Sequence, residues 1–175
     1  MPNGVCLVET RTPVNNVTFG HDAELTRRIT ATTGIKATTS LTAVVEALRV
    51  LGIEKPAIAT SYIADIDARL VDVLEKSGFA VAAIKGVGIK RSIDMGRVEP
   101  AETYRLAKQV ARSALGADGI LVSCGNLRSF EVIEPLETDT GLPIVTSNQA
   151  GLWQALRLVG VNERLPNLGR LLRNH

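Results

Sequence analysis

The chain alternates between short apolar runs and longer segments in which apolar residues recur at helical spacing. Eight segments follow one another in the order 55–60, 63–77, 80–84, 101–115, 118–123, 128–139, 142–146 and 149–159, beginning with an apolar run. The apolar runs are too short to form helices, whereas the segments between them have the three- or four-residue period of amphipathic helices. Strands and helices in this order predict an α/β fold with a parallel sheet flanked by helices.

A block of strand, helix, strand and helix occurs twice in the chain. Three pairs of segments match in the same order, 3–8 with 118–123, 33–40 with 140–147, and 47–53 with 155–161. Common α/β patterns sometimes match by chance, but the shared order and spacing favour an internal duplication. The duplication predicts two pseudosymmetric lobes with a cleft between them.

Each lobe is expected to take a defined part of the chain. Residues 1–40 together with 144–175 are expected to form the first lobe, and residues 41–143 the second. The second copy of the block is preceded by two strands and two helices, whereas the first copy begins near Met1. If the halves are equivalent, roughly sixty residues are missing from the front of the first lobe. We therefore expect an incomplete first lobe and a chain that is truncated at its N-terminus.

Composition narrows the classes of function. Of 175 residues, 45% are hydrophobic and 3% aromatic, so the core is aliphatic and base-stacking nucleic-acid modules are disfavoured. The net charge of +2 is spread along the chain and predicts no nucleic-acid partner. No apolar run reaches membrane-spanning length. Two cysteines without paired spacing fit a reducing cytoplasm and indicate neither a disulfide nor a metal site. We expect a cytoplasmic homo-oligomer.

Cys124 is the strongest candidate for chemistry. The run Ile120-Leu-Val-Ser-Cys-Gly-Asn126 is an apolar strand that ends abruptly in a thiol and a glycine, directly before a predicted helix. A nucleophile or proton carrier belongs at such a strand end in an α/β protein. The alternative is that Cys124 is a small buried hydrophobic residue. Lys85-Gly-Val-Gly88 lacks the third glycine of a dinucleotide fingerprint, so no such cofactor is predicted.

Three motifs resemble one known superfamily. They are Ala57-Ile-Ala-Thr-Ser-Tyr-Ile-Ala-Asp65, Gly119-Ile-Leu-Val-Ser-Cys-Gly-Asn126 and Pro143-Ile-Val-Thr-Ser-Asn-Gln-Ala-Gly-Leu-Trp153. Together they are similar to the aspartate/glutamate racemase superfamily, and within it to arylmalonate decarboxylases and maleate cis-trans isomerases. The resemblance implies a site between two α/β lobes, and carbon-acid chemistry on a small carboxylic acid without a metal or an organic cofactor.

The superfamily usually carries one cysteine on each lobe. By this resemblance Cys124 is the second-lobe cysteine. The first-lobe position falls at Thr10 when counted back from residues 22–25, or at Glu9 by the internal repeat. Cys6 is the only other thiol, but it lies inside a predicted strand, so its role stays open. Absence of the first cysteine resembles the decarboxylase branch, which works with a single cysteine.

The resemblance also assigns residues that bind the substrate or an oxyanion. Tyr62 matches the family tyrosine and would donate to a carboxylate oxygen, although it is also explained as an aromatic residue at the core edge. The N–H groups of Gly125 and Asn126 would form part of an oxyanion pocket, while Asn126 is equally suited to cap a helix. Thr12 is a candidate donor in the first-lobe turn. Arg11 departs from the small hydroxyl residues usual there, and either pairs with a second carboxylate or faces solvent.

Four further residues have two interpretations each. At the end of a later strand, Thr146, Ser147 and Asn148 either contact substrate or cap the next helix. Met95 either lines an apolar substrate pocket or packs in the core. Neither choice is decided by the sequence.

The resemblance implies a decarboxylase for a malonate-type acid. Loss of carbon dioxide leaves an enediolate, which needs preorganised donors and which Cys124 would protonate. In a maleate cis-trans isomerase, the thiolate would instead add to the double bond. A third possibility is an inactive remnant that binds small acids or serves as an oligomerisation module.

Overall fold

A four-stranded parallel sheet forms the centre of the protein. The computed structural model describes residues 4–8 and 21–175. The sheet has the strand order β4-β3-β5-β6, with β3 at Pro56–Thr60, β4 at Ala83–Gly86, β5 at Gly119–Ser123 and β6 at Ile144–Thr146. The register places Thr60 opposite both Gly86 and Ser123, so the carboxyl ends of β3, β4 and β5 lie at one edge. The predicted α/β class is confirmed.

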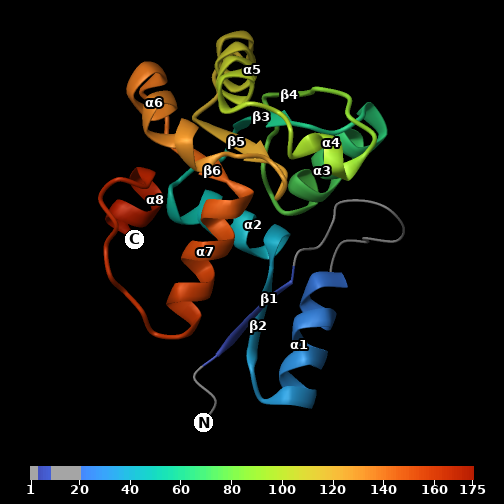
Figure 1. Ribbon diagram of the computed structural model, residues 1–175, viewed down its shortest axis with the longest axis vertical. Helices are drawn as coiled ribbons and strands as arrows, with labels where there is room; N and C mark the ends of the chain where they lie inside the picture. The colour runs from blue at the N-terminus through green and yellow to red at the C-terminus, as the bar shows by residue number, and fades with distance from the viewer. Residues whose placement is uncertain (1–3, 9–20) are drawn as a thin grey trace.

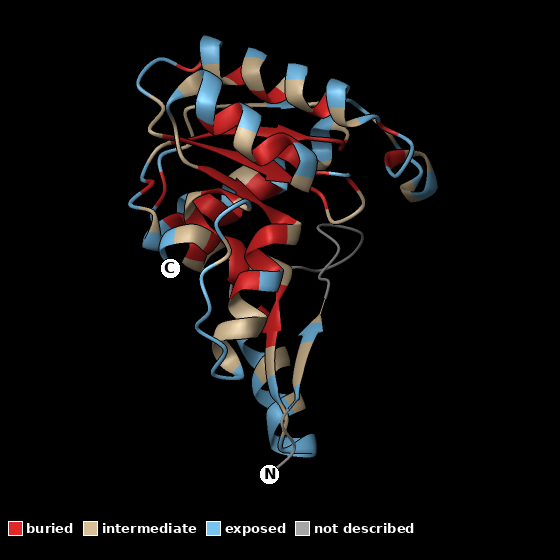
Figure 2. Cartoon of the chain, turned by 60° about the vertical axis from the view of Figure 1, so that its left-hand side comes forward, coloured by how far each residue is buried: buried red, intermediate tan, exposed pale blue. Residues whose placement is uncertain are grey.

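Helices cover both faces of this sheet. Helices α5 (Pro100–Ser113) and α6 (Phe130–Thr140) lie on one face in Figure 1 and Figure 2. The opposite face carries α2 (Ser40–Val50), α3 (Ala64–Lys76), α7 (Ser147–Leu158) and α8 (Gly169–Asn174). The two faces bury separate apolar clusters. Because β3 and β5 are buried along their whole length, their sequences are continuous apolar runs and not alternating patterns.

A second, smaller sheet extends away from the first (Figures 1 and 2). Strands β1 (Val5–Val8) and β2 (Lys36–Thr39) pair in parallel, and α1 (His21–Thr33) lies beside them. In α1 the one buried residue is Asp22. This sheet holds part of the predicted first lobe, and the division into lobes stays a prediction. Strand β6, which opens the segment 144–175, hydrogen-bonds to β5 of the four-stranded sheet.

The internal repeat is visible in matched residues that have matched roles. Thr39 and Thr146 occupy equivalent positions, and each caps the helix that follows its strand, α2 or α7. Gly52 and Gly160, which also correspond, both have positive φ after the ends of these helices. Helices α2 and α7 pack against each other. The duplicated segments therefore face one another at the junction of the two sheets.

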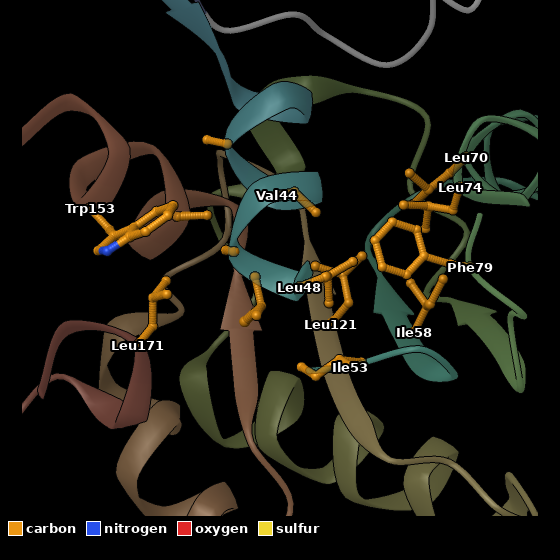
Figure 3. Close-up of a cluster of buried hydrophobic side chains, with 14 of the residues drawn as sticks. Val44, Leu48, Ile53, Ile58, Leu70, Leu74, Phe79, Leu121, Trp153 and Leu171 are labelled. Atoms are coloured by element: carbon orange, nitrogen blue, oxygen red, sulfur yellow. The ribbon is translucent and has the colours of Figure 1, made fainter. Parts of the chain in front are cut away.

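The largest apolar cluster lies around α2 (Figure 3). Val44 and Leu48 project from α2 toward the sheet, where Leu121 of β5 is fully buried. Trp153 of α7 and Leu171 of α8 complete the cluster on the other side of α2. Removal of these side chains from water supplies roughly 1.5–3 kcal/mol for each large residue. A helix of the first repeat is thus held by the core of the four-stranded sheet.

Several predicted boundaries need correction. The expected strand at 80–84 is instead β4 at Ala83–Gly86, because Phe79 and Val81 pack into the core before the strand begins. The helix expected at 128–139 begins at Phe130, and the one expected at 149–159 begins at Ser147. Helix α4 (Ser92–Met95) and α8 were not predicted, because four and six residues are too few to show a helical period.

Across the described residues, no helix combines the length and apolar character needed to cross a membrane.

Candidate active site

Cys124 is the first residue after β5. Its side chain is 4% exposed, and its Sγ lies 3.8 Å from Sδ of Met95. Both belong to an apolar cluster that also contains Tyr62, Val98 and Leu127. The predicted delivery of a thiol by a buried strand is confirmed. Met95, for which two roles were predicted, packs directly against that thiol.

Tyr62 lies at the same edge of the sheet as Cys124. It follows β3, whose last residue, Thr60, is opposite Ser123 at the end of β5. The Tyr62 side chain is 8% exposed and joins the same apolar cluster as Cys124. The structure therefore brings together the two predicted residues that come from neighbouring strand ends.

A buried hydrogen-bond chain fixes the backbone at Tyr62. The Thr60 hydroxyl donates to Oδ1 of Asp67 at 2.6 Å and accepts from the N–H of Tyr62 at 3.1 Å. The carbonyl of Tyr62 accepts from the N–H of Gly88 at 2.9 Å. A Cβ at Gly86 would lie 2.2 Å from the Tyr62 carbonyl oxygen and 2.5 Å from Oδ2 of Asp67. Only glycine fits at position 86 without displacing this arrangement.

Asp67 is a carboxyl group held inside the protein. Burial raises the pKa of Asp67 above its ordinary value, and the hydrogen bond from Thr60 partly opposes that rise. Asp67 lies on the same face of α3 as Leu70 and Leu74, which are also buried. A carboxyl group on an apolar helix face is costly unless it is hydrogen-bonded, so its bond to Thr60 stabilises the strand end.

The turn after Cys124 differs from the prediction at Asn126. Helix α6 begins at Phe130 with Ser129 as its N-cap residue, so Asn126 does not cap this helix. Five residues separate the start of α6 from Cys124. The Asn126 side chain instead donates through Nδ2 to Ser92, to the carbonyl oxygen at 2.9 Å and to Oγ at 2.6 Å. The Leu127 N–H donates to the carbonyl of Cys124 at 3.2 Å and closes the turn. Gly125 and Asn126 are half-buried within it.

The strand end at β6 contributes structural contacts. Thr146 accepts from the N–H of Gln149 and forms a capping box with it, so the capping interpretation is confirmed for Thr146. Asn148 donates through Nδ2 to the carbonyl of Leu127 at 3.0 Å, which supports the Cys124 turn from the side of α7. Ser147 is buried.

The first-lobe candidates Thr10, Arg11 and Thr12, and the alternative position Glu9, lie outside the described residues. Cys6 lies inside β1, as the sequence predicts, opposite Ala37 of β2, and is half-buried with a free thiol. Within residues 4–8 and 21–175, no three or more His, Cys, Asp or Glu side chains are grouped so as to hold a metal ion.

Sequence reasoning missed three residues at this site: Thr60, Asp67 and Ser92. Asp67 had a usable signal, because a carboxyl group interrupts the apolar face of a helix that follows a strand. Thr60 and Ser92 had none. Ser92 is 34 positions from Asn126 in the chain, and a contact between residues so far apart is set by the tertiary fold.

Comparison with known sequences identifies related enzymes. A family profile described as arylmalonate decarboxylase matches residues 18–172. The arylmalonate decarboxylase of Bordetella bronchiseptica is 37% identical over 151 residues, which is 86% of this chain and 63% of that protein. The maleate isomerase of Nocardia farcinica is 27% identical over 132 residues, 75% of this chain and 52% of that protein. The chain thus spans less than two thirds of the length of these curated relatives.

Solved structures with the same fold agree with these sequences. A crystal structure of arylmalonate decarboxylase has a TM-score of 0.90 at 33% identity and covers 98% of this chain and 76% of its own. A mutant of the Nocardia farcinica maleate cis-trans isomerase, solved with a covalently bound succinylcysteine intermediate, has a TM-score of 0.83 at 23% identity. That match covers 89% of this chain and 65% of the isomerase chain.

Proposed function

Because the chain belongs to the arylmalonate decarboxylase family, we propose that it decarboxylates a malonate-type acid, with Cys124 as the residue that protonates the intermediate. The observation that carries this proposal is the position of one buried thiol at the end of β5, beside Tyr62. Its wider class, a cofactor-independent enzyme of carbon-acid chemistry, is that of the decarboxylase and isomerase relatives.

The proposed reaction has two steps. In the first, the bond between the α-carbon and one carboxylate breaks, and its electron pair moves into an enediolate as carbon dioxide leaves. In the second, the Cys124 thiol transfers its proton to the α-carbon, which yields a monocarboxylate and a thiolate. A proton from water restores the thiol. Because one thiol delivers the proton from one face, the product is a single enantiomer.

The enediolate carries negative charge that needs fixed hydrogen-bond donors. We assign this role to the hydroxyl of Tyr62 and to the backbone N–H groups of Gly125 and Asn126. In support, the Tyr62 backbone is fixed by Thr60, and the 124–127 turn is closed by its own hydrogen bond. Donors that are held before the reaction cost little reorganisation during it. Thr10, Arg11 and Thr12 remain proposed first-lobe contacts to the second carboxylate.

The test is a turnover assay in deuterated water with malonates, maleate and amino acids, on the parent chain and on Cys124→Ala. We expect a deuterium atom at the α-carbon of the product. We expect Cys124→Ala to lose roughly 10³-fold in turnover, the scale of general acid catalysis. Tyr62→Phe keeps the ring and removes one donor, so a smaller loss of about 10²-fold is expected.

Cys6→Ser is the matched control, since it also removes a thiol but from inside β1. It should retain parental turnover. Equal turnover by the parent and by Cys124→Ala contradicts the proposed role of Cys124. A folded parent chain that converts none of these acids contradicts the enzyme proposal and favours a small-acid binding remnant.

A second candidate function is maleate cis-trans isomerisation, which the 27% identity to the Nocardia farcinica enzyme supports. There the Cys124 thiolate would add to one carbon of the double bond, the adduct would rotate about the resulting single bond, and elimination would return the thiolate with fumarate. Conversion of maleate without release of carbon dioxide would select this function over the first.

A further inference from the structure

Helix α4 contacts the Cys124 turn through two of its residues, Ser92 and Met95. Nδ2 of Asn126 donates to the Ser92 carbonyl at 2.9 Å and to its Oγ at 2.6 Å. The thioether of Met95 lies 3.8 Å from the Cys124 thiol. A Cβ on Gly96, just past the helix, would lie 3.7 Å from the Asn126 carbonyl oxygen. This four-residue helix therefore packs against the proposed catalytic thiol through Met95.

Among the residues that the structure describes, few other contacts hold α4 in place. Met95 is its one buried residue, and Ile93 is 61% exposed. Asp94 pairs with Arg91 and Arg97, but both pairs are solvent-exposed and lie within the same short segment. Exposed pairs of this kind contribute little to stability. A segment with so few buried contacts is expected to open without unfolding of the whole protein.

The segment is anchored outside the helix at both ends. The N–H of Ile89 donates to the carbonyl of Ser61 at 3.0 Å, and Val98 is buried in the cluster around Cys124. Between these anchors, the side-chain hydrogen bonds that the described residues make to the rest of the protein are those from Asn126 to Ser92. Asn126 thus ties the middle of the segment to the turn that carries the thiol.

We infer that Asn126 is a positioning residue that holds α4 and Met95 over Cys124, and so sets how often small molecules reach the thiol. The inference rests on the proposed function in one respect, because that function supplies the substrate that reaches the thiol. The Asn126 side chain acts through Ser92 and Met95, and its amide is committed to Ser92. Its role is therefore separate from any role of its backbone N–H at the enediolate.

The test measures how fast iodoacetamide alkylates Cys124, in a Cys6→Ser parent so that a single thiol reacts. Asn126→Ala removes both hydrogen bonds to Ser92 and should raise the alkylation rate about tenfold, because α4 opens more often. Ser92→Ala removes one acceptor and keeps the carbonyl, so a rise of about threefold is expected. Low concentrations of urea should change these rates little, because a local opening exposes little surface.

Asn148→Ala is the matched control. Its amide also donates one hydrogen bond to the 124–127 turn, at the Leu127 carbonyl, but it does not bind α4. Its alkylation rate should stay within about twofold of the parent rate. Equal rises in Asn126→Ala and Asn148→Ala would assign the effect to a loosened turn and overturn the inference. An unchanged rate in Asn126→Ala, or a steep urea dependence, would overturn it as well.

If Asn126→Ala does not fold, hydrogen exchange of the unmutated chain tests whether α4 opens locally. Exchange of the amides at 94–98 much faster than that of α3 supports a cover that opens, whereas equal protection overturns it. Neither measurement requires turnover. A chain that consumes no malonate but still shows accelerated alkylation in Asn126→Ala would contradict the proposed function and leave this inference standing.

Discussion

Helices α1 and α3 have the same length, 13 residues, and very different surroundings. Helix α3 buries four residues against the four-stranded sheet, whereas α1 buries Asp22 alone. The strands differ in the same way, since all five residues of β3 and of β5 are buried and none of the four residues of β1 is (Figure 2). Burial of apolar surface is the main source of stability. The four-stranded region therefore holds most of the folding free energy, and the small sheet depends on its junction with α2 and α7.

The largest test of this comparison replaces one leucine in each sheet. Leu121 of β5 is fully buried, while Leu7 of β1 is 44% exposed and contacts α7 at Gly151. We expect Leu121→Ala to lower the free energy of unfolding by about 4 kcal/mol, and Leu7→Ala by under about 1 kcal/mol. Urea denaturation of both variants measures this. Equal losses would show that the small sheet is as tightly packed as the large one.

A pair of glycines gives a smaller contrast. A Cβ at Gly86 would clash with the Tyr62 carbonyl oxygen and with Asp67, whereas no atom of residues 4–8 and 21–175 lies within 4 Å of a Cβ at Gly4. Gly86→Ala should cost about 3 kcal/mol through overpacking, and Gly4→Ala under about 0.5 kcal/mol. Thermal unfolding with circular dichroism compares the two. A Gly86→Ala variant as stable as the parent would mean that the strand end yields easily.

For the two capping threonines, we expect the larger loss of stability at the small sheet and not at the four-stranded one. Thr39 caps α2 and also donates to Oδ2 of Asp22 at 2.6 Å, while Oδ1 of Asp22 is buried without a partner in the described part of the chain. Thr39→Ala should therefore cost about 2 kcal/mol, against about 1 kcal/mol for Thr146→Ala. The serine variants of both, which keep the hydroxyl, serve as controls in the same urea titration. A larger loss at Thr146 would contradict a dependence of the small sheet on its junction.

The smallest expected effect is a pH dependence at Asp67. Because the pKa of Asp67 is raised in the folded protein, the folded state binds the proton more tightly than the unfolded state. The contribution of Asp67 to the free energy of unfolding is therefore most favourable below the ordinary pKa of Asp. It declines as the pH rises through the raised pKa of the folded state. Asp67→Asn lacks this decline, so its stability relative to the parent should increase between about pH 3 and pH 7. Urea midpoints that diverge in the opposite direction would contradict a raised pKa.

The sequence predicts best where burial is complete. Strands β3 and β5 are apolar runs that are buried along their whole length, so the local sequence is enough to predict both strands. It also predicts that Tyr62 and Cys124 lie just after their ends. Strand β4 was predicted at 80–84, ahead of its start at Ala83, because Val81 is apolar for its contact with the core and not for pairing in the sheet. Local pattern cannot separate these two causes.

The rest of the site depends on contacts between distant segments. The capping alternative for Asn126 was wrong because α6 begins only at Phe130. The contact that its amide makes instead, with Ser92, could not be predicted because the helix that carries Ser92 is too short. Asp67 and Thr60 act as a pair only once α3 folds back on β3. The local sequence therefore predicts the positions of the candidate site residues, whereas the residues that contact and support them are set by tertiary packing.

The fluorescence of Trp153 reports on the packing of α7 against α2. It is the only tryptophan of the chain, and the residue is 7% exposed within the cluster that joins the two repeats. Its emission therefore originates from that junction alone, without background from other indoles. Separation of α7 from α2 shifts this emission to longer wavelength, so a fluorimeter follows the contact between the duplicated halves directly and without a label.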